Sequence, residues 1–177
     1  MSESPTHDLA ARLARGDQAA FAELYDACAD RLHGYLVARL GSRDAASDVL
    51  QNAFLRAVKS RRRFRGVENP VAYMFQVARN EAARALKKRP APNHVWPAGQ
   101  RIVQTDRNAE YAEDAETVAA ALGRLDADDR ELVELKIYAG LTFREIAAIV
   151  DRPAATVATR YRRALESLRE WLAKQFR

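Results

Sequence analysis

The chain has few of the features that stabilise secreted or membrane-embedded proteins. Cys28 is the only cysteine among 177 residues, so no internal disulfide can form, and its place in an apolar helical stripe predicts a core residue in a reducing compartment. No apolar run approaches the length of a membrane span, and the polar, charged segment 1–16 lacks the pattern of a secretory signal. We therefore expect a cytoplasmic protein without membrane insertion.

The sequence is also poor in catalytic and metal-ligating patterns. His7, His33 and His94 are scattered along the chain, and a single cysteine cannot complete a zinc quartet. Acidic residues gather in the segment 106–134, which we interpret as a hinge region away from the basic surfaces. The sequence therefore predicts no catalytic residue, no metal site and no cofactor, and we do not expect an enzyme.

Positive charge, by contrast, is in excess and is clustered. The formal net charge is +5 and the isoelectric point is about 9.6. Basic residues crowd into the segments 56–65, 79–89 and 152–177. Scattered surface lysines and arginines can serve solubility alone, whereas clusters of this kind favour a polyanionic partner such as nucleic acid.

Apolar residues recur at helical spacing along most of the chain, and almost no strand pattern is present. Gly41 is expected to end one helix, and Asn69 followed by Pro70 is expected to begin another. Three prolines and a glycine in residues 89–100 interrupt the pattern and indicate a linker. The predicted fold is all-α: an N-terminal tail (1–15), a small helical domain (16–89), a flexible linker (90–113) and a second small helical domain (114–177).

The segment 141–174 has the layout of a DNA-reading helix-turn-helix. Thr142 and Glu145 form a capping-box pair that predicts a helix start, with Asp126 capping the helix before it. We expect a turn ending at Pro153, which would occupy the first position of the second helix. At about 100° per residue, one outer face of that helix carries Ala155, Thr156, Thr159, Arg162 and Arg163. An ordinary solvated helix face would look similar, but the capping box, the turn and the preceding helix favour DNA recognition.

Two further surfaces are predicted in the first domain. An arginine-rich loop with an aromatic ring, followed by an aromatic and amide stripe, suits single-stranded DNA; its residues are Arg61, Arg62, Arg63, Phe64, Arg65, Tyr73, Gln76, Asn80 and Arg84. The alternative is that Phe64 and Tyr73 are core or rim residues. The helix 48–58 is expected to expose Leu50, Gln51, Asn52 and Leu55, which favours a partner-binding face, although deeper burial of the helix would explain the same pattern.

The order of these features resembles a bacterial RNA polymerase sigma factor of the sigma-70 family, in the small extracytoplasmic-function (ECF) group that keeps domains sigma-2 and sigma-4. The resemblance covers 16–172 and rests on GDQAAFAELYDACADRLHGYLVARL, SRDAASDVLQNAFLRAV, FRGVENPVAYMFQVARNEAARALKKR and LDADDRELVELKIYAGLTFREIAAIVDRPAATVATRYRRALESLREWL. It implies a factor that binds core RNA polymerase and promoter DNA at the nucleoid and directs transcription initiation, with no catalysis of its own.

The resemblance assigns residues to three tasks. Contacts with the clamp helices of the largest polymerase subunit would fall to Asp48, Gln51, Asn52 and Leu55. Opening and capture of the −10 element would fall to the arginine-rich loop and aromatic stripe above, together with Asn69. Reading of the −35 element would fall to Thr159, Arg162 and Arg163, with Lys136, Ala155, Thr156 and Arg160 near phosphates. Members of the group are often held by an anti-sigma factor, although no motif here identifies one.

Three positions depart from the family pattern. Tyr73 stands where many members have a tryptophan, Asn52 where an acidic residue is frequent, and Ala158 where a basic residue is common. A smaller stacking surface, an altered polymerase contact and a missing phosphate contact are the respective expectations. Two other classes share some of these features: a conventional helix-turn-helix repressor or activator, which would bind duplex DNA without polymerase, and a nucleic-acid enzyme, which the scattered histidines disfavour.

Overall fold

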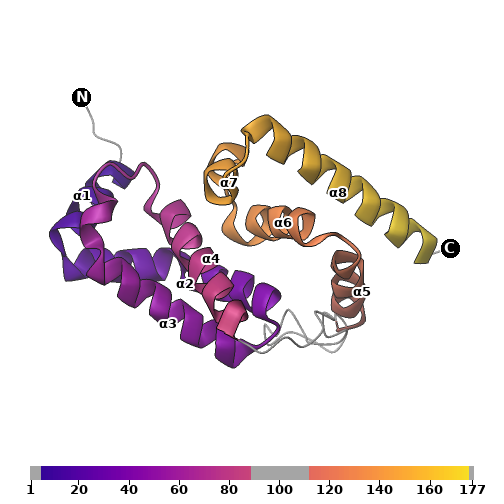
Figure 1. Cartoon of the computed structure of the whole chain (residues 1–177), viewed down its shortest axis with the longest axis horizontal. Coiled ribbons are helices and arrows are strands. Elements are labelled where there is room, and N and C mark those ends of the chain that lie inside the picture. Colours follow the sequence, from indigo (N-terminus) through magenta and orange to yellow (C-terminus); the bar gives the residue numbers. More distant parts are fainter. Residues whose placement is uncertain (1–4, 89–111, 176–177) are drawn as a thin grey trace.

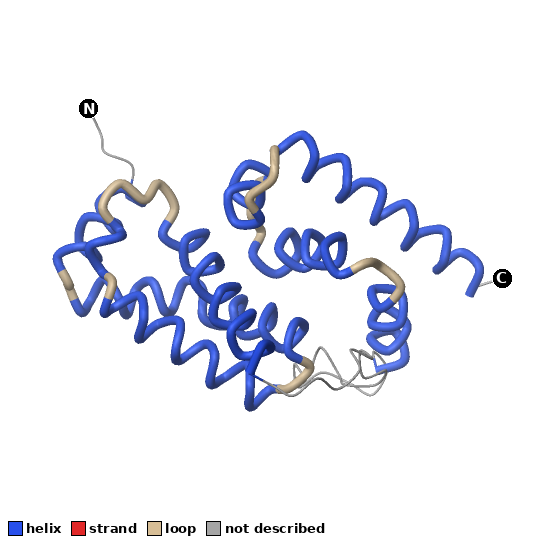
Figure 2. Tube along the Cα trace, in the orientation of Figure 1, coloured by secondary structure: helices blue, strands red, loops and turns tan. Residues whose placement is uncertain are grey.

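The structure is a computed structural model in which residues 5–88 and 112–175 are described. That part of the chain is helical and contains no strand, which confirms the predicted all-α fold (Figures 1 and 2). The elements are α1 (Pro5–Arg15), α2 (Gln18–Leu40), α3 (Arg43–Lys59), the 3₁₀ turn η1 (Arg61–Phe64), α4 (Pro70–Lys88), α5 (Ala112–Gly123), α6 (Ala127–Ala139), α7 (Phe143–Val150) and α8 (Ala154–Gln175). Most of the predicted linker lies outside the described residues.

The predicted helix boundaries follow from short-range hydrogen bonds. Gly41 ends α2 in the left-handed conformation (φ 65°), where a glycine is favoured. The Oδ1 atom of Asn69 accepts hydrogen bonds from the Val71 and Ala72 amides (3.0 and 3.1 Å) and so begins α4. Asp126 caps α6 by accepting from the Asp129 amide at 2.8 Å. All three caps were expected from the sequence.

The helix-turn-helix is formed by α7 and α8. Thr142 Oγ1 accepts from the Glu145 amide (3.3 Å) and Glu145 Oε2 accepts from the Thr142 amide (2.8 Å), which confirms the capping box. Asp151 (φ 55°) ends α7 in the left-handed region. Pro153 lies one residue before α8 rather than in its first position, and its carbonyl accepts the Val157 amide.

The first helical unit is built from α1 to α4 with η1. Residues 5–15, assigned from the sequence to an N-terminal tail, form α1, and the Leu13 side chain is fully buried. Cys28 is buried as predicted; its thiol donates to the Leu24 carbonyl, and burial raises its pKa to about 12, so it remains a thiol. No helix in the described ranges is long and apolar enough to cross a bilayer.

The second helical unit packs directly on the first. α6 lies against α2 and α7 lies against α4, so residues far apart in sequence share one apolar core (Figure 1). Gly34 of α2 faces Tyr138 of α6, and a Cβ added at Gly34 would be 3.2 Å from the Tyr138 ring. A glycine inside a helix costs about 1 kcal/mol relative to alanine, but here it gives the tyrosine ring room.

A buried charge cluster crosses the contact between α2, α4 and α6. Glu131 is 4% exposed, and both of its carboxylate oxygens accept hydrogen bonds from Arg79 (2.8 and 3.1 Å). Tyr35 donates its hydroxyl to the same carboxylate at 3.1 Å, and Arg39 forms an ion pair with it at 2.9 Å. The prediction that the acidic segment stays away from basic surfaces is wrong. Glu131 of that segment lies on the face of α6 that meets α2 and α4, where it pairs with Arg39 and Arg79.

Glu134 lies one turn further along the same face of α6. It is 3% exposed; its Oε1 atom has no hydrogen-bond partner within the described residues, and the same is true of Arg39 Nε. Desolvation raises the pKa of Glu134 to about 7, against the opposing influence of Arg39 and Arg130. Burial on α6 therefore favours the protonated, uncharged form of the Glu134 carboxyl group.

This arrangement predicts a specific pH dependence. The pKa of Glu134 is raised from 4.5 to about 7 on folding. Its contribution to the free energy of unfolding is therefore fully present below pH 4.5 and is lost as pH rises through 7. In urea unfolding, the stability of the wild type should fall by up to about 3 kcal/mol relative to Glu134→Gln between pH 5 and pH 8. Parallel pH profiles for the two proteins would contradict the buried, protonatable state.

Candidate nucleic-acid interface

The outer face of α8 is open to solvent. Ala155, Thr156, Thr159, Arg162 and Arg163 are all exposed, as the helical spacing predicted. Val157 and Ala164 on the opposite side are buried, and the Tyr161 ring packs 5.3 Å from Phe143 of α7. The helix therefore presents hydroxyl and guanidinium groups outward while its apolar side is held by the rest of the helix-turn-helix.

Lys136, a predicted phosphate contact, supports the turn before α7. Its ammonium group donates to the Leu141 carbonyl at 2.7 Å and lies 5.1 Å from the centre of the Phe143 ring. The side chain is half-buried. Its charge is thus placed beside the start of the helix-turn-helix by a hydrogen bond and a cation–π contact.

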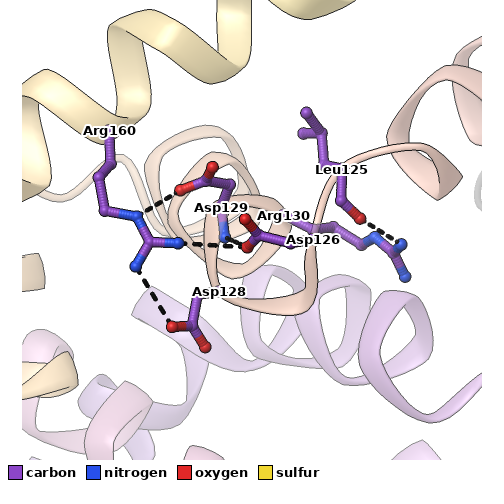
Figure 3. Close-up of polar contacts among 6 residues, drawn as sticks. All are labelled: Leu125, Asp126, Asp128, Asp129, Arg130 and Arg160. Atoms are coloured by element: carbon purple, nitrogen blue, oxygen red, sulfur yellow. Dashed lines mark hydrogen bonds and ion pairs between the residues drawn. The ribbon is translucent and has the colours of Figure 1, made fainter.

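Arg160 is engaged by carboxylates at the start of α6. Figure 3 shows its guanidinium group between Asp126, Asp128 and Asp129. Its Nε atom donates to Asp129 at 2.6 Å, and the two terminal nitrogens donate to Asp128 and Asp126, both at 3.2 Å. The hydrogen bond to Asp129 is the main reason that the pKa of this guanidinium lies above the ordinary value for arginine.

The arginine-rich segment of the first unit divides into exposed charges and a buried ring. Arg61, Arg62, Arg63 and Arg65 are exposed on and after η1. Phe64 is fully buried, edge-on to Phe21 (6.0 Å) and Tyr73 (5.0 Å). The expectation that Phe64 faces nucleic acid is therefore corrected: the 3₁₀ turn directs its apolar ring into the core, where it backs Tyr73.

The predicted stripe on α4 is present with graded exposure. Tyr73 and Gln76 are half-buried, whereas Asn80 and Arg84 are exposed. Arg84 donates to Glu81 at 2.6 Å, and Glu81 also pairs with Arg56 of α3. One continuous side of α4 thus carries an aromatic ring, two amides and a guanidinium.

Part of this stripe lies next to α7. The amide of Asn69 donates to Glu145 Oε1 at 2.5 Å, so the residue that caps α4 is also bonded to the residue that caps α7. Although burial favours the neutral acid, the hydrogen bonds from the Thr142 backbone and Asn69 hold the pKa of Glu145 below its usual value. Tyr73 and Gln76 line a surface hollow together with Glu145 and Ile149.

The helix α3 exposes a mixed apolar and polar surface. Gln51, Asn52 and Leu55 are exposed as predicted, and the candidate contact Asp48 is exposed as well. Leu50 is 9% exposed and belongs to the core, so its predicted exposure was wrong. Two exposed apolar residues were missed: Val58, 44% exposed, and Tyr25 of α2, whose ring lies 5.0 Å from Phe54. Val58 follows Gln51 by seven residues and Leu55 by three, a spacing that could have identified it.

Within 5–88 and 112–175, no group of histidine, cysteine or acidic side chains is arranged to hold a metal ion. Two polar clusters in this part of the chain, around Glu131 and around Arg160, instead pair carboxylates with arginines.

Comparison with known proteins identifies both helical units. The family model described as Sigma-70 region 2 matches residues 24–90, and that described as Sigma-70, region 4 matches residues 115–168. The ECF RNA polymerase sigma factor RpoE of Cereibacter sphaeroides is 30% identical over 161 residues, covering 89% of this chain and 88% of the relative. The RNA polymerase sigma-H factor of Pseudomonas aeruginosa is 26% identical and covers 95% and 94%.

Solved structures share the fold. CnrH in its complex with the cytosolic domain of CnrY is similar with a TM-score of 0.73, 22% identity, and coverage of 97% of this chain and 99% of that one. The sigma factor RpoE bound to the anti-sigma factor NepR from Bartonella quintana gives a TM-score of 0.68 at 24% identity, covering 86% and 96%. The chain belongs to the sigma-70 family of RNA polymerase sigma factors, in its extracytoplasmic-function group.

Proposed function

We propose that this sigma factor directs core RNA polymerase to promoters through three separate surfaces of the chain. α8 reads the −35 element in duplex DNA, η1 and α4 hold the opened −10 strand, and the exposed side of α3 binds the polymerase clamp helices. The observation that carries the proposal is the exposed Thr159, Arg162 and Arg163 face on the second helix of a helix-turn-helix, within a sigma-70 region 4 match.

The −35 contacts follow from the geometry of α8. The second helix of a helix-turn-helix enters the major groove with the residues near its start toward base edges. Thr156 and the Ala155 amide lie at that end and suit phosphates, since free amides at a helix start attract anions. Arg162 and Arg163 lie one turn further on, and a guanidinium can donate two hydrogen bonds to guanine.

The −10 contacts combine charge, stacking and amides. The exposed arginines Arg61, Arg62, Arg63 and Arg65 would hold the strand backbone. Tyr73 offers a ring for stacking, and the buried Phe64 ring behind it limits its motion. Gln76 and Asn80 can hydrogen-bond the edge of an unstacked base. Phe64 is therefore assigned to support of Tyr73, not to direct contact.

Full use of this surface requires α7 to move away from α4. Asn69 donates its amide N–H to Glu145, and Gln76 lines a hollow with Glu145 and Ile149. A single DNA strand and α7 would therefore compete for Asn69 and Gln76. The exposed face of α8 does not lie in that contact. We propose that the −35 surface is available in the packed form and that the −10 surface becomes fully available when the two helical units separate.

Polymerase binding fits the side of α3 that carries Gln51, Leu55 and Val58. Interface cores combine exposed apolar groups with a polar rim, and Asp48 and Asn52 supply that rim here. Tyr25 with Phe54 extends the apolar area onto α2. The apolar area added by Val58 and Tyr25 would offset the binding energy lost at Asn52, which stands where an acidic residue is frequent in the family.

The remaining assignments follow from this division of work. Polymerase makes the phosphodiester bond, so we propose no catalytic activity or cofactor for the chain, which would act in the cytoplasm at the nucleoid. An anti-sigma factor is a further proposed partner, because a sigma factor of similar fold is known in complex with one. The first domain proposed is extended from 16–89 to 5–89, because α1 packs into the first helical unit. The second is extended from 114–177 to 112–177, because α5 begins at Ala112, and the linker proposed is 90–111.

Alanine substitution of Arg162 or Arg163 tests the reading of bases. Each variant, assembled with core polymerase, should lose about 1–3 kcal/mol of discrimination at one position of the −35 element, because one set of base-edge hydrogen bonds is removed. Competition binding with singly substituted promoter duplexes measures this. Arg169→Ala, exposed two turns further along α8, is the matched control and should leave every preference unchanged. Unaltered preferences in both test variants would remove these arginines from base reading.

The polymerase surface is tested by changing Gln51 and Leu55 together to alanine. The double variant should bind core polymerase about tenfold more weakly, because truncation of central interface side chains typically costs 1 kcal/mol or more. Val118→Ala is the control, since Val118 of α5 is exposed to the same extent as Leu55, 50%. Equal affinity of the double variant and the wild type in a fluorescence titration would place the interface elsewhere.

A further inference from the structure

Arg160 differs from the other predicted DNA contacts on α8 because three carboxylates of the same chain engage its guanidinium group. Its side chain is 29% exposed, and each of its three guanidinium nitrogens donates to a different aspartate (Figure 3). The shortest of these contacts joins Arg160 Nε to Asp129 Oδ1 at 2.6 Å, and the Asp129 side chain is 21% exposed. Three of the five N–H donors of the guanidinium, one on each nitrogen, are therefore already engaged within the protein.

Helical geometry places Arg160 at the border of the reading face. At about 100° per residue, Arg160 is rotated about 100° from exposed Thr159 and about 60° from buried Val157. It therefore points along the side of α8 that meets α6. The residues on either side of Thr159 on the outer face are Arg162 and Arg163.

The carboxylates that hold Arg160 belong to the start of α6. Asp126 Oδ1 accepts both the Asp129 amide, which caps α6, and the guanidinium of Arg160 (3.2 Å). A single oxygen atom thus connects the beginning of α6 with α8. The apolar cluster nearby, which includes Val133 of α6 and Ala164 of α8, has no directional preference, whereas a guanidinium fork fixes both distance and rotation.

Local charge also disfavours a phosphate at this point. Three carboxylates more than compensate the charge of Arg160, although Arg79 and Arg152 line the same hollow. Phosphate groups are repelled by such a site and attracted by uncompensated lysine or arginine. The predicted phosphate contact therefore conflicts with the surroundings of Arg160.

We propose that Arg160 is a positioning residue that fixes the rotation of α8 on α6, so that Thr159, Arg162 and Arg163 meet the same base pairs in every complex. This inference rests on the proposed role of α8 in reading the −35 element. Arg160 acts through the helix it orients and does not itself touch DNA.

Arg160→Lys and Asp129→Asn distinguish positioning from phosphate binding. Lysine keeps the charge and can serve a phosphate, but its single ammonium nitrogen cannot reproduce the planar fork of three nitrogens that Arg160 presents to the three aspartates. The experiment uses polymerase holoenzyme and duplexes selected from a random pool by the wild-type holoenzyme. Affinities are measured over a series of salt concentrations for the selected duplex and for each singly substituted −35 duplex.

If Arg160 is a positioning residue, the affinity ratio between the selected duplex and a −35-substituted duplex should fall about fivefold or more in each variant. The slope of log affinity against log salt concentration should stay unchanged. The double variant should lose no more than either single variant, because both remove the same connection. Arg169→Lys and Asp30→Asn, both at exposed positions, should match the wild type. A variant that merely unfolds in part binds all duplexes less well by one factor, so its discrimination ratio is unchanged; that result would overturn the proposal.

Phosphate binding predicts a different set of results. Arg160→Lys would then bind normally, Asp129→Asn would bind more tightly because repulsion is removed, and Arg160→Ala would reduce the salt slope by about one. Any of these outcomes would overturn the positioning role. If the wild-type holoenzyme selects no duplex with a −35 preference, the proposed function of α8 fails, and the inference fails with it for that separate reason.

Discussion

The carboxylate of Glu131 is the contact on which the arrangement of the molecule depends. It lies on α6 of the second helical unit, yet its partners Arg39, Arg79 and Tyr35 all come from the first. A buried carboxylate without partners would cost several kcal/mol, so α6 is stable in this place only against these groups. Gly34, which leaves room for Tyr138, allows α6 to approach closely enough for the contact to form.

The same contact controls which functional surfaces are free. With α6 on α2, α7 lies beside α4, and Asn69 is bonded to Glu145. The reading face of α8 points away from this contact and remains exposed. Among the residues that the structure describes, neighbouring Glu134 and Arg39 each retain a buried polar atom without a hydrogen-bond partner, so the packing carries an energetic cost that a competing partner could relieve. A single packed state therefore treats the −35 and −10 surfaces differently.

Local sequence signals predicted most of the helices. Caps at Gly41, Asn69, Asp126 and Thr142 depend on hydrogen bonds within four residues, and each was found where the sequence placed it. The apolar periodicity likewise identified the two helical units and the exposed face of α8. The resemblance to ECF sigma factors, based on motif order, was confirmed by the family matches.

Features that depend on contacts between distant segments could not be read from the sequence. Phe64 sits among arginines and looks exposed, but the turn η1 directs it against Phe21 and Tyr73. Arg160 looks like a surface charge because its aspartate partners lie about thirty residues earlier in the chain. Glu131 looks like one of many acidic residues in the segment 106–134. In each case a side chain's role is decided by the packing of a second helix, which periodicity along one helix does not reveal.

The packing held by Glu131 can be measured directly in the free protein. Spin labels at Lys59→Cys on α3 and Ser167→Cys on α8, in a Cys28→Ala background, report the distance between the two helical units by electron–electron double resonance. We predict one narrow distance distribution for the wild type and for the control Glu170→Gln, and a broad distribution shifted to longer distances for Glu131→Gln. An unchanged narrow distribution in Glu131→Gln, or a broad one in the wild type, would contradict the role of this carboxylate.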